Sequence, residues 1–289
     1  MTTQLASKRV SMENILFATD FSRHSNQALP FVLSIARKYG STVSAVHVIP
    51  PSGLPPTMEV RAIAAQALRE ADEGMKAVSS RLQGIPHTLV VRKGDVGEEL
   101  SAVVEQNGID LIIVGTHGRA GASKLLMGSV SERIVRQSSC PVLTVGPNVS
   151  EEPEGVADIH TILYPTDFSS ESMAALPYAV SLAQENQARL YLLHVMPASQ
   201  ADSFDDALGV RLRALVPPEA KLWCEPKVYV ESGDAAEKIL ELAEELAVDL
   251  IVLGTKHVSR FAATRTHLGM ATAYRVMIQA LCPVLSVRG

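Results

Sequence analysis

Short apolar runs alternate with amphipathic stretches along most of the chain. In the first half, the runs "ILFAT", "TVSAVHVI", "HTLVV", "DLIIVG" and "PVLTVG" have the length and β-branched content of buried strands. Between them, apolar residues recur at three- and four-residue steps, the spacing of one helical face. In "SRHSNQALPFVLSIARKYG" that face comprises Ala28, Phe31, Val32, Ile35 and Ala36. Continuous apolar strands that alternate with helices predict a parallel sheet covered on both faces.

Single residues suggest where the helices end or bend. Gly40 is expected to end the helix that follows the first strand. Pro30 lies within that helix and predicts a mild kink rather than a break, and Pro177 repeats it later in the chain. Further helices are expected in "TMEVRAIAAQALREADEGMKAVSSRL", in "VGEELSAVVEQNG" and through "SERIVRQS".

The same plan occurs twice. The stretch "NILFATDFSRHSNQALPFVLSIARKYGSTVSAVHVIP" (14–50) matches "TILYPTDFSSESMAALPYAVSLAQENQARLYLLHVMP" (161–197), and "IDLIIVGT" and "SCPVLTVG" return as "VDLIVLGT" and "LCPVLSVR". Between the copies, "GPNVSEEPEGVAD" (146–158) has the composition of an exposed linker. We therefore expect two α/β domains, 1–148 and 149–289. Each is predicted to be a Rossmann-like, doubly wound fold with a five-stranded parallel sheet and helices on both faces.

The composition is that of an ordinary globular protein, with 47% hydrophobic and 20% charged residues in 289. A formal net charge of −5 provides no general attraction for nucleic acids or anionic membranes. No apolar run has the length of a membrane span or a signal peptide, and the three cysteines do not make a disulfide framework. These features predict a cytoplasmic protein with no nucleic-acid or membrane partner.

Glycines and basic residues separate "IDLIIVG" from the next helix, in "GTHGRAGASKLLMGSVSERIV". Gly115 and Gly118 let the backbone turn tightly and approach a ligand. Gly128 and Ser129 open a helix whose first amides have no intrahelical acceptors, and its partial positive charge favours phosphate. Additional donors or positive charges come from Ser129, Ser131, Arg119 and Lys124. A glycine pair alone more often just turns the chain, but the preceding strand and the following helix favour phosphate binding.

These segments resemble tandem members of the UspA family of universal stress proteins. The resemblance is carried by "ILFATDFS", "AVHVIP", "GTHGRAGASKLLMGSVSERIV" and "CPVLTV" with their counterparts, and it covers nearly the whole chain. It implies a fold similar to the adenine nucleotide α-hydrolases. The pattern Gly-x2-Gly-x9-Gly-Ser is the nucleotide signature of the family and implies ATP in this loop of the first copy. Mg²⁺ would accompany the phosphates.

The resemblance also implies roles for individual residues. Those around adenine and ribose are Ala18, Thr19, Asp20 and Val48, with Val114 and Gly115 beneath the ribose. Those around the phosphates are His117, Gly118, Gly128, Ser129, Val130 and Ser131, with Arg119 as a neutralising charge. No catalytic or metal-ligating residue is assigned.

Other interpretations remain for some of these residues. Asp20, or Ser22, also suits the cap of the following helix. His47, which returns as His194, is expected to be a satisfied core residue rather than a catalyst. The residues expected to pack before a Pro-Val-Leu strand are Cys140 and Cys282.

The second copy keeps only part of the predicted site. It retains Thr166, Asp167 and Gly254, but His257 replaces Gly118, and Met270 falls near the place of Ser129. A Cβ obstructs a close approach, and methionine offers no donor, so the second domain is expected not to bind ATP in the same way. Its loop is cationic through Lys256, His257, Arg260, Arg265 and His267. This loop suits a solvated surface better than an anion site, and its two histidines are weak evidence for a metal.

Three functions are compatible with the sequence: an ATP-binding stress protein with a regulatory or protective role, an interaction scaffold without nucleotide, and a slow ATPase. An enzyme is disfavoured because "ATDFSRHS" lacks the serine-glycine-glycine loop of ATP-pyrophosphatases and the chain has no Walker lysine pattern. An intact glycine loop disfavours the scaffold.

The expected partners, besides an adenine nucleotide, are the two copies themselves. Their last strands are potential sheet edges, which proteins usually pair or cover. Members of the resembled family often dimerise through this strand. We therefore expect an internal pseudo-dimer, with a homodimer of chains as a further option, and the segment from Pro50 to Leu82 as a lid or contact surface.

Overall fold

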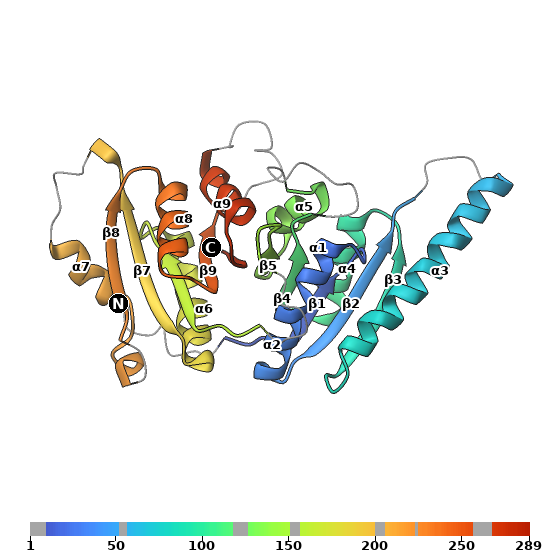
Figure 1. The fold of residues 1–289 in the computed structure, drawn as a ribbon, viewed down its shortest axis with the longest axis horizontal. Coiled ribbons are helices and arrows are strands. Elements are labelled where there is room, and N and C mark those ends of the chain that lie inside the picture. The colour runs from blue at the N-terminus through green and yellow to red at the C-terminus, as the bar shows by residue number, and fades with distance from the viewer. Residues whose placement is uncertain are drawn as a thin grey trace.

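A single ten-stranded sheet runs through the whole molecule. The computed structural model describes residues 10–51, 57–117, 127–150, 157–199, 206–222, 225–256 and 268–289, with the backbone alone at 221–222 and 268–271. The strand order is β3-β2-β1-β4-β5-β10-β9-β6-β7-β8. The two halves of the chain therefore lie side by side, and each contributes five consecutive strands (Figure 1).

The N-terminal half supplies five parallel strands. They are β1 (Asn14–Ala18), β2 (Thr42–Ile49), β3 (His87–Lys93), β4 (Leu111–Gly115) and β5 (Val142–Val145). Its helices are α1 (Arg23–Gln27), α2 (Leu29–Tyr39), α3 (Met58–Arg81), α4 (Val96–Asn107) and α5 (Ser129–Gln137). The alternation predicted from apolar runs and helical periodicity is confirmed.

The C-terminal half repeats this plan. Its parallel strands are β6 (Thr161–Pro165), β7 (Arg189–Met196), β8 (Lys227–Ser232), β9 (Leu250–Thr255) and β10 (Val284–Arg288). Its helices are α6 (Ser170–Asn186), α7 (Asp206–Arg213), the 3-10 helix η2 (Pro218–Leu222), α8 (Ala235–Glu245) and α9 (Leu268–Gln279). The shorter α7 and η2 stand where the first half has the long helix α3.

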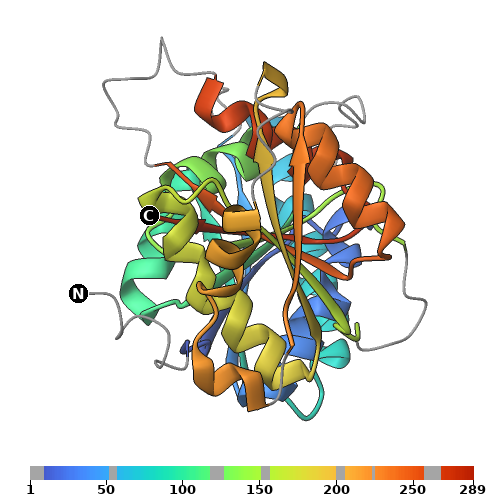
Figure 2. The same ribbon diagram turned by 90° about the vertical axis from the view of Figure 1, so that its left-hand side faces the viewer.

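Helices cover both faces of the twisted sheet, as the end-on view shows (Figure 2). One core cluster joins the sheet to α2, α3 and α6, and the other joins it to α4, α5, α8 and α9. Each cluster extends through both halves of the chain, so the two five-stranded units share continuous apolar layers. Within the described ranges, no helix is both long and apolar enough to cross a membrane.

The first helical segment differs from the expectation at Pro30. The chain forms two helices, α1 and α2, that meet at Ala28, and Pro30 occupies the first turn of α2. Proline is well tolerated in a first helical turn, so a new helix starts here rather than a kinked one continuing. In the second half, Pro177 stays inside the continuous α6. Gly40 ends α2 in the left-handed conformation with φ 67°, as predicted.

The two halves are joined by the antiparallel pairing of β5 with β10, in which Leu143 lies opposite Leu285. Two hydroxyls reinforce the joint in a symmetrical manner: Thr144 Oγ1 donates to the Val284 carbonyl and Ser286 Oγ to the Val142 carbonyl, each at 3.1 Å. The prediction that the last strands of the two copies pair within the chain is confirmed.

The ends of the predicted linker are exposed at some positions and buried at others, with Asn148 and Asp158 exposed. Val149 and Ala157 are buried at 6% and 3% exposure, and Asn148 donates from its side chain to the carbonyls of Ile278 and Gln279. The acidic centre of the linker, 151–156, lies outside the described residues. The prediction of an exposed linker therefore does not hold at Val149 and Ala157, because composition averaged over the segment hides two apolar positions that pack against the core.

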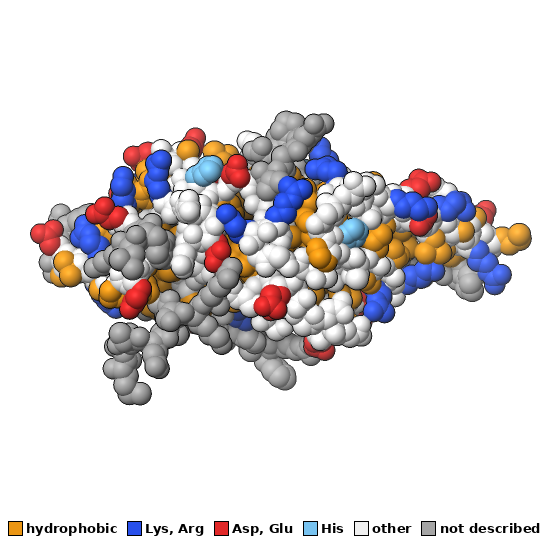
Figure 3. Space-filling model, turned by 90° about the horizontal axis from the view of Figure 1, so that it is seen from below, with side chains coloured by type: hydrophobic (Ala, Val, Ile, Leu, Met, Phe, Trp, Pro, Cys, Tyr) orange, Lys and Arg blue, Asp and Glu red, His pale blue; other side chains and the backbone are white. Residues whose placement is uncertain are grey.

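Helix α3 extends beyond the sheet at one end of the molecule (Figure 1). Buried side chains occur only in its second part, at Ala71, Met75 and Val78. Its first part carries apolar side chains among charges of both signs (Figure 3), and Met58 is 90% exposed.

Candidate functional site

A cavity lies where the strand order of the first half reverses. Strands β1 and β4 are neighbours, but the helices that follow them pack on opposite faces of the sheet. Such a point opens a crevice at the carboxyl ends of the strands. Here it encloses about 640 Å³, a volume in the range of small-molecule sites.

The cavity brings together all the predicted nucleotide-binding residues that the structure describes. They are Ala18, Thr19, Asp20, Val48, Val114, Gly115, His117, Gly128, Ser129, Val130 and Ser131. Gly118 and Arg119 lie outside the described residues. The predicted set therefore converges on one place, although its members come from four separate stretches of sequence.

Helix α5 begins at this cavity without a side-chain cap. Its N-cap is Gly128, which has no side chain to accept from the helix, whereas Asp95 caps α4 by accepting from the Glu98 amide at 3.0 Å. Helix geometry leaves the first amides of α5, those of Ser129, Val130 and Ser131, without intrahelical acceptors. This end of the helix can therefore accept an anion from the cavity.

The start of α5 is tied to the neighbouring strand ends. The Gly128 amide donates to the Thr116 carbonyl at 2.8 Å, and the Thr116 amide donates to the Val145 carbonyl at 2.9 Å. Ser131 Oγ donates to the Gly115 carbonyl at 2.7 Å. The hydroxyl of Ser131, expected to be a donor to phosphate, is thus engaged with the backbone, so Ser131 offers its amide, and Ser129 offers an exposed hydroxyl.

Gly115 is required by packing. A Cβ at this position would lie 2.7 Å from the His24 carbonyl oxygen, because the start of α1 packs against the end of β4. Gly254, the counterpart in the second half, is crowded in the same way by the Glu171 carbonyl. A glycine that both halves need for packing says nothing about which half binds a ligand.

The first-strand side of the cavity is held by short-range hydrogen bonds. Thr19 Oγ1 accepts from the Phe21 amide at 3.0 Å and lies 3.1 Å from Ser25 Oγ. Phe21 has φ 61°, a left-handed conformation stabilised by this turn. His47 Nδ1 donates to the Thr19 carbonyl at 2.8 Å.

The helix cap after β1 is Ser22 rather than Asp20. Ser22 Oγ accepts from the Ser25 amide at 3.2 Å, and Asp20 Oδ1 accepts from the Ser22 amide at 3.0 Å. Asp20 thus stabilises the turn before the helix and also lines the cavity. Its two proposed roles are compatible in geometry.

Two histidines differ in what they contribute. His47 is 8% exposed and hydrogen-bonded, as expected for a core residue, but it also reaches the cavity wall. His117 is 4% exposed, and its Nδ1 lies 2.9 Å from Thr116 Oγ1. Its ring is 5.6 Å from that of His24, between centroids.

Sequence reasoning missed part of the cavity wall. The missed residues are Ser25, Val46, Ile49, Pro50, Ala67, Glu70, Val96, Leu100 and Met127, together with His47, which was assigned only to the core. Val46 shares the face of β2 with Val48, so strand alternation could have identified it. Pro50, Ala67 and Glu70 lie in the segment expected to be a lid or contact surface, but only the path of α3 in space identifies these individual residues as part of the cavity wall.

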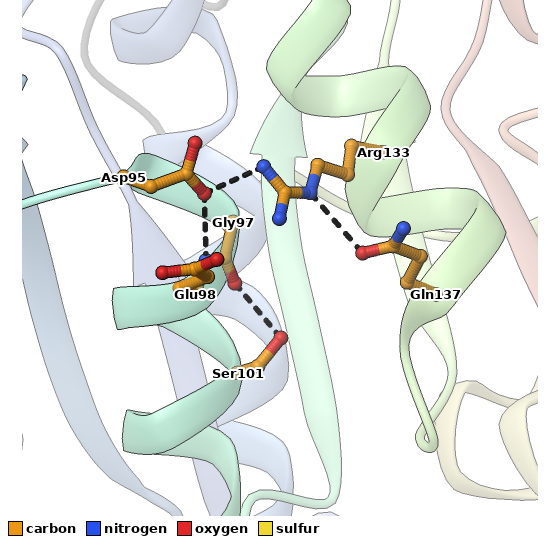
Figure 4. A network of polar contacts seen from close by, with 6 residues as sticks. All are labelled: Asp95, Gly97, Glu98, Ser101, Arg133 and Gln137. Atoms are coloured by element: carbon orange, nitrogen blue, oxygen red, sulfur yellow. Dashed lines mark hydrogen bonds and ion pairs between the residues drawn. The ribbon is translucent and has the colours of Figure 1, made fainter.

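A polar network fixes α5 relative to α4 (Figure 4). Arg133 donates from Nη1 to Asp95 Oδ1 at 2.5 Å and from Nε to Gln137 Oε1 at 3.1 Å. The Glu98 amide first, and then the Arg133 guanidinium, lower the pKa of the Asp95 carboxyl below its ordinary value. Asp95 therefore both caps α4 and holds α5 through Arg133.

The second half has the same arginine–aspartate contact, and this contact can be used to align α9 with α5. Arg275 pairs with Asp234, the N-cap of α8, at 2.8 Å, and α9 ends at Gln279 as α5 ends at Gln137. Counted from these fixed points, α9 begins three residues earlier than α5, since it has 12 residues and α5 has 9.

This alignment changes the comparison of the two loops. Met270 stands opposite Gly128 rather than Ser129, and Ala273 stands opposite Ser131, so the hydroxyl that bonds to the Gly115 carbonyl has no counterpart. The amides of residues 271–273 lie inside α9 and can donate to the preceding turn. The Thr255 carbonyl accepts from the Gly289 amide at 3.3 Å, a contact that its counterpart Thr116 does not share because the Thr116 carbonyl accepts from Gly128. His257 lies outside the described residues.

The described cysteines have packing roles. Cys282 is 6% exposed, and burial raises the pKa of its thiol to about 12. Burial also raises the pKa of Cys140, whose sulfur lies 3.4 Å from Ser138 Oγ.

Known proteins resemble both halves. The sequence model of the universal stress protein family matches residues 12–146 and again residues 158–288. A universal stress protein of Methanocaldococcus jannaschii is 30% identical over 138 residues, which cover 46% of this chain and 81% of that protein. Universal stress protein A homolog 1 of Coxiella burnetii is 32% identical over 145 residues, 46% of this chain and 95% of that protein.

The complete architecture also has a known parallel. The crystal structure of a universal stress protein from Archaeoglobus fulgidus matches with a TM-score of 0.72 at 22% identity, over 96% of this chain and 98% of that chain. This likeness concerns the fold of the whole tandem molecule.

Proposed function

The chain belongs to the universal stress protein family, and from this premise we propose that its N-terminal half binds ATP in the cavity between β1 and β4. The protein acts as a nucleotide-dependent regulatory or protective factor, and its C-terminal half does not bind ATP in the same way. The single observation that carries the proposal is the uncapped start of α5, which opens into this cavity.

The chemistry of the cavity suits the two ends of a nucleotide. Apolar side chains from strands β2 and β4, together with Pro50 just after β2, offer a surface for a flat base. At the other side, the amides of Ser129, Val130 and Ser131 offer hydrogen bonds and partial positive charge to phosphates. Asp20 lines the same cavity, and its carboxylate can accept from a ribose hydroxyl or bind a Mg²⁺ ion carried by the phosphates.

The differences between the halves support one nucleotide per chain. Helix α9 has three additional residues at its N-terminus, before the position that corresponds to the start of α5. Since the amides at that point are inside a helix, they are not available to phosphate. The retained Gly254 is accounted for by its packing against Glu171.

The test is to denature the purified full chain, identify the released nucleotide, and then titrate nucleotide-free protein with ATP. We expect about one equivalent of adenine nucleotide or less, and an ATP-dependent rise in the melting temperature. Absence of bound nucleotide together with no response to ATP would contradict the proposal. Two equivalents would contradict the assignment of the site to one half.

The decisive variant is Gly128→Asp. The backbone at Gly128 has φ −61° and ψ 143°, which any residue adopts, so the protein should fold. An aspartate there would cap α5 with its own carboxylate and raise the melting temperature of the nucleotide-free protein slightly. The same carboxylate would occupy the phosphate position and repel ATP, so the ATP-dependent shift should vanish. A variant that still responds to ATP would place the nucleotide elsewhere.

A further inference from the structure

We propose that the C-terminal half controls the affinity of the N-terminal half for nucleotide through Tyr274, which positions the start of α5. This inference rests on the proposed function and assigns to the second half a regulatory role at the site of the first. Tyr274 lies in α9, and its hydroxyl accepts from the amide of Met127 at 3.1 Å. Met127 immediately precedes Gly128, the N-cap of α5.

The hydrogen bond acts on a segment that also lines the cavity. Met127 is 5% exposed and forms part of the cavity wall, and the next amide, that of Gly128, donates to the Thr116 carbonyl. Two consecutive amides are thus held from two sides, one by the C-terminal half and one by the end of β4. The amides that follow them, at 129–131, are the ones that face the proposed phosphates.

Tyr274 lies in a helix that is held to its surroundings at several points. The next residue, Arg275, is fixed to Asp234, and Val276 and Met277 are buried at 0% and 1% exposure. The strand pairing of β5 with β10 and the Asn148 bonds hold α9 against the N-terminal half. The hydroxyl therefore transmits the position of α9 directly to the start of α5.

The hydrogen bond between Met127 and Tyr274 has no counterpart in the other direction among the described residues, although the pairing of β5 with β10 is symmetrical. By the alignment of α5 with α9, Glu132 stands where Tyr274 stands, and its carboxylate pairs with Arg136 at 3.2 Å within its own helix. The first half therefore makes no matching tyrosine contact with the second. This asymmetry fits a division of roles in which one half binds and the other regulates.

Coupling of this kind is reciprocal. If Tyr274 favours the conformation of α5 that binds phosphate, bound nucleotide must equally favour the docked position of α9. A partner that engages the C-terminal half and shifts α9 would thus change the nucleotide affinity, and nucleotide would change the affinity for that partner.

The experiment compares Tyr274→Phe with the wild-type full chain by calorimetric titration with ATP and with adenosine. Phenylalanine keeps the ring and removes only the acceptor oxygen. We expect ATP to bind about fivefold more weakly, the equivalent of about 1 kcal/mol for one hydrogen bond. Adenosine, which does not reach the start of α5, should bind with unchanged affinity. Amide hydrogen exchange at Met127 in nucleotide-free protein should accelerate.

The matched control is Tyr164→Phe, which removes another tyrosine hydroxyl from the C-terminal half. That hydroxyl donates to the Ser172 carbonyl at 2.7 Å within the C-terminal half and, in the described part of the chain, makes no contact with α5, so its loss should lower stability without changing ATP affinity. Equal ATP affinities in wild type and Tyr274→Phe would overturn the inference alone. Equal weakening for ATP and adenosine would also overturn it. A wild type that binds no ATP would overturn the proposed function, and the inference with it.

Discussion

Gly115 and Gly128 look alike in the sequence but meet different physical requirements. Gly115 has no room for a Cβ because the His24 carbonyl lies against it, and the second half keeps a glycine at this position under the same pressure. Gly128 has an ordinary backbone conformation, and its missing side chain leaves the start of α5 uncapped. The first glycine serves the fold and the second serves the proposed ligand.

We predict that Gly115→Ala destabilises the protein by about 1–3 kcal/mol, as overpacking of a tight contact usually does. Chemical denaturation of the nucleotide-free chain measures this change. Gly209→Ala is the matched control, because it lies in α7 with only the end of the Arg213 side chain near the new methyl group. A helical Gly→Ala change there should stabilise by up to about 1 kcal/mol. Equal behaviour of the two variants would show that the His24 contact is not restrictive.

At the scale of elements, the position of each helix start is decided by a cap and by an anchor in the next helix. Asp95 and Asp234 each cap one helix and hold an arginine of another. In both cases the amide of the capped helix is the first cause of a lowered carboxyl pKa, and the arginine adds to it. Both copies keep the pair, so it belongs to the fold rather than to the ligand site.

The lowered pKa values predict how stability responds to acid. Since the folded-state pKa of each carboxyl lies below the ordinary value of 3.8, the stabilisation is present above that value and is lost as pH falls through the lower folded one. The double variant Asp95→Asn, Asp234→Asn keeps cap acceptors but does not titrate. Its melting temperature should therefore fall less than that of the wild type between pH 5 and about pH 2. Parallel curves would contradict this prediction.

The elements show how far the sequence could lead. Apolar runs predicted the strands of the first half to within one or two residues at each end, and α3 begins directly after its cap Thr57, a local signal in the sequence. The cluster of Ala18, Gly115 and Gly128 around one cavity followed from the resemblance and from the switch in strand order. Ala67, Glu70 and Tyr274 could not be found this way, because their place depends on how α3 and α9 lie in space.

At the scale of the whole molecule, β5 and β10 satisfy each other's edges. In an isolated N-terminal half, the edge of β5 that pairs with β10 at residues 142–144 would be left unpaired. We predict that residues 1–148, the proposed first domain, self-associate through this strand, as measured by light scattering. The substitution Thr144→Lys, at a residue whose hydroxyl reaches β10 in the full chain, should make the fragment monomeric, since charged edge residues oppose pairing. A wild-type fragment that stays monomeric would contradict the prediction.

A homodimer of complete chains would have to use a different surface, because β5 and β10 are already paired. The two strands left at the ends of the sheet are β3 and β8. The first part of α3 also exposes apolar side chains, Met58 and Ile63, on the outside of the molecule.

The covalent joining of the two copies has a consequence that a pair of identical subunits cannot reach. Where two equal chains meet, every contact across the boundary occurs twice, and any tyrosine that braces one site braces the other. Within one polypeptide, a contact such as the hydrogen bond between Met127 and Tyr274 can occur once, so that one half positions the other without the reverse. When the two copies of a tandem chain differ in sequence, one copy can regulate and the other can bind, and every molecule contains one copy of each kind.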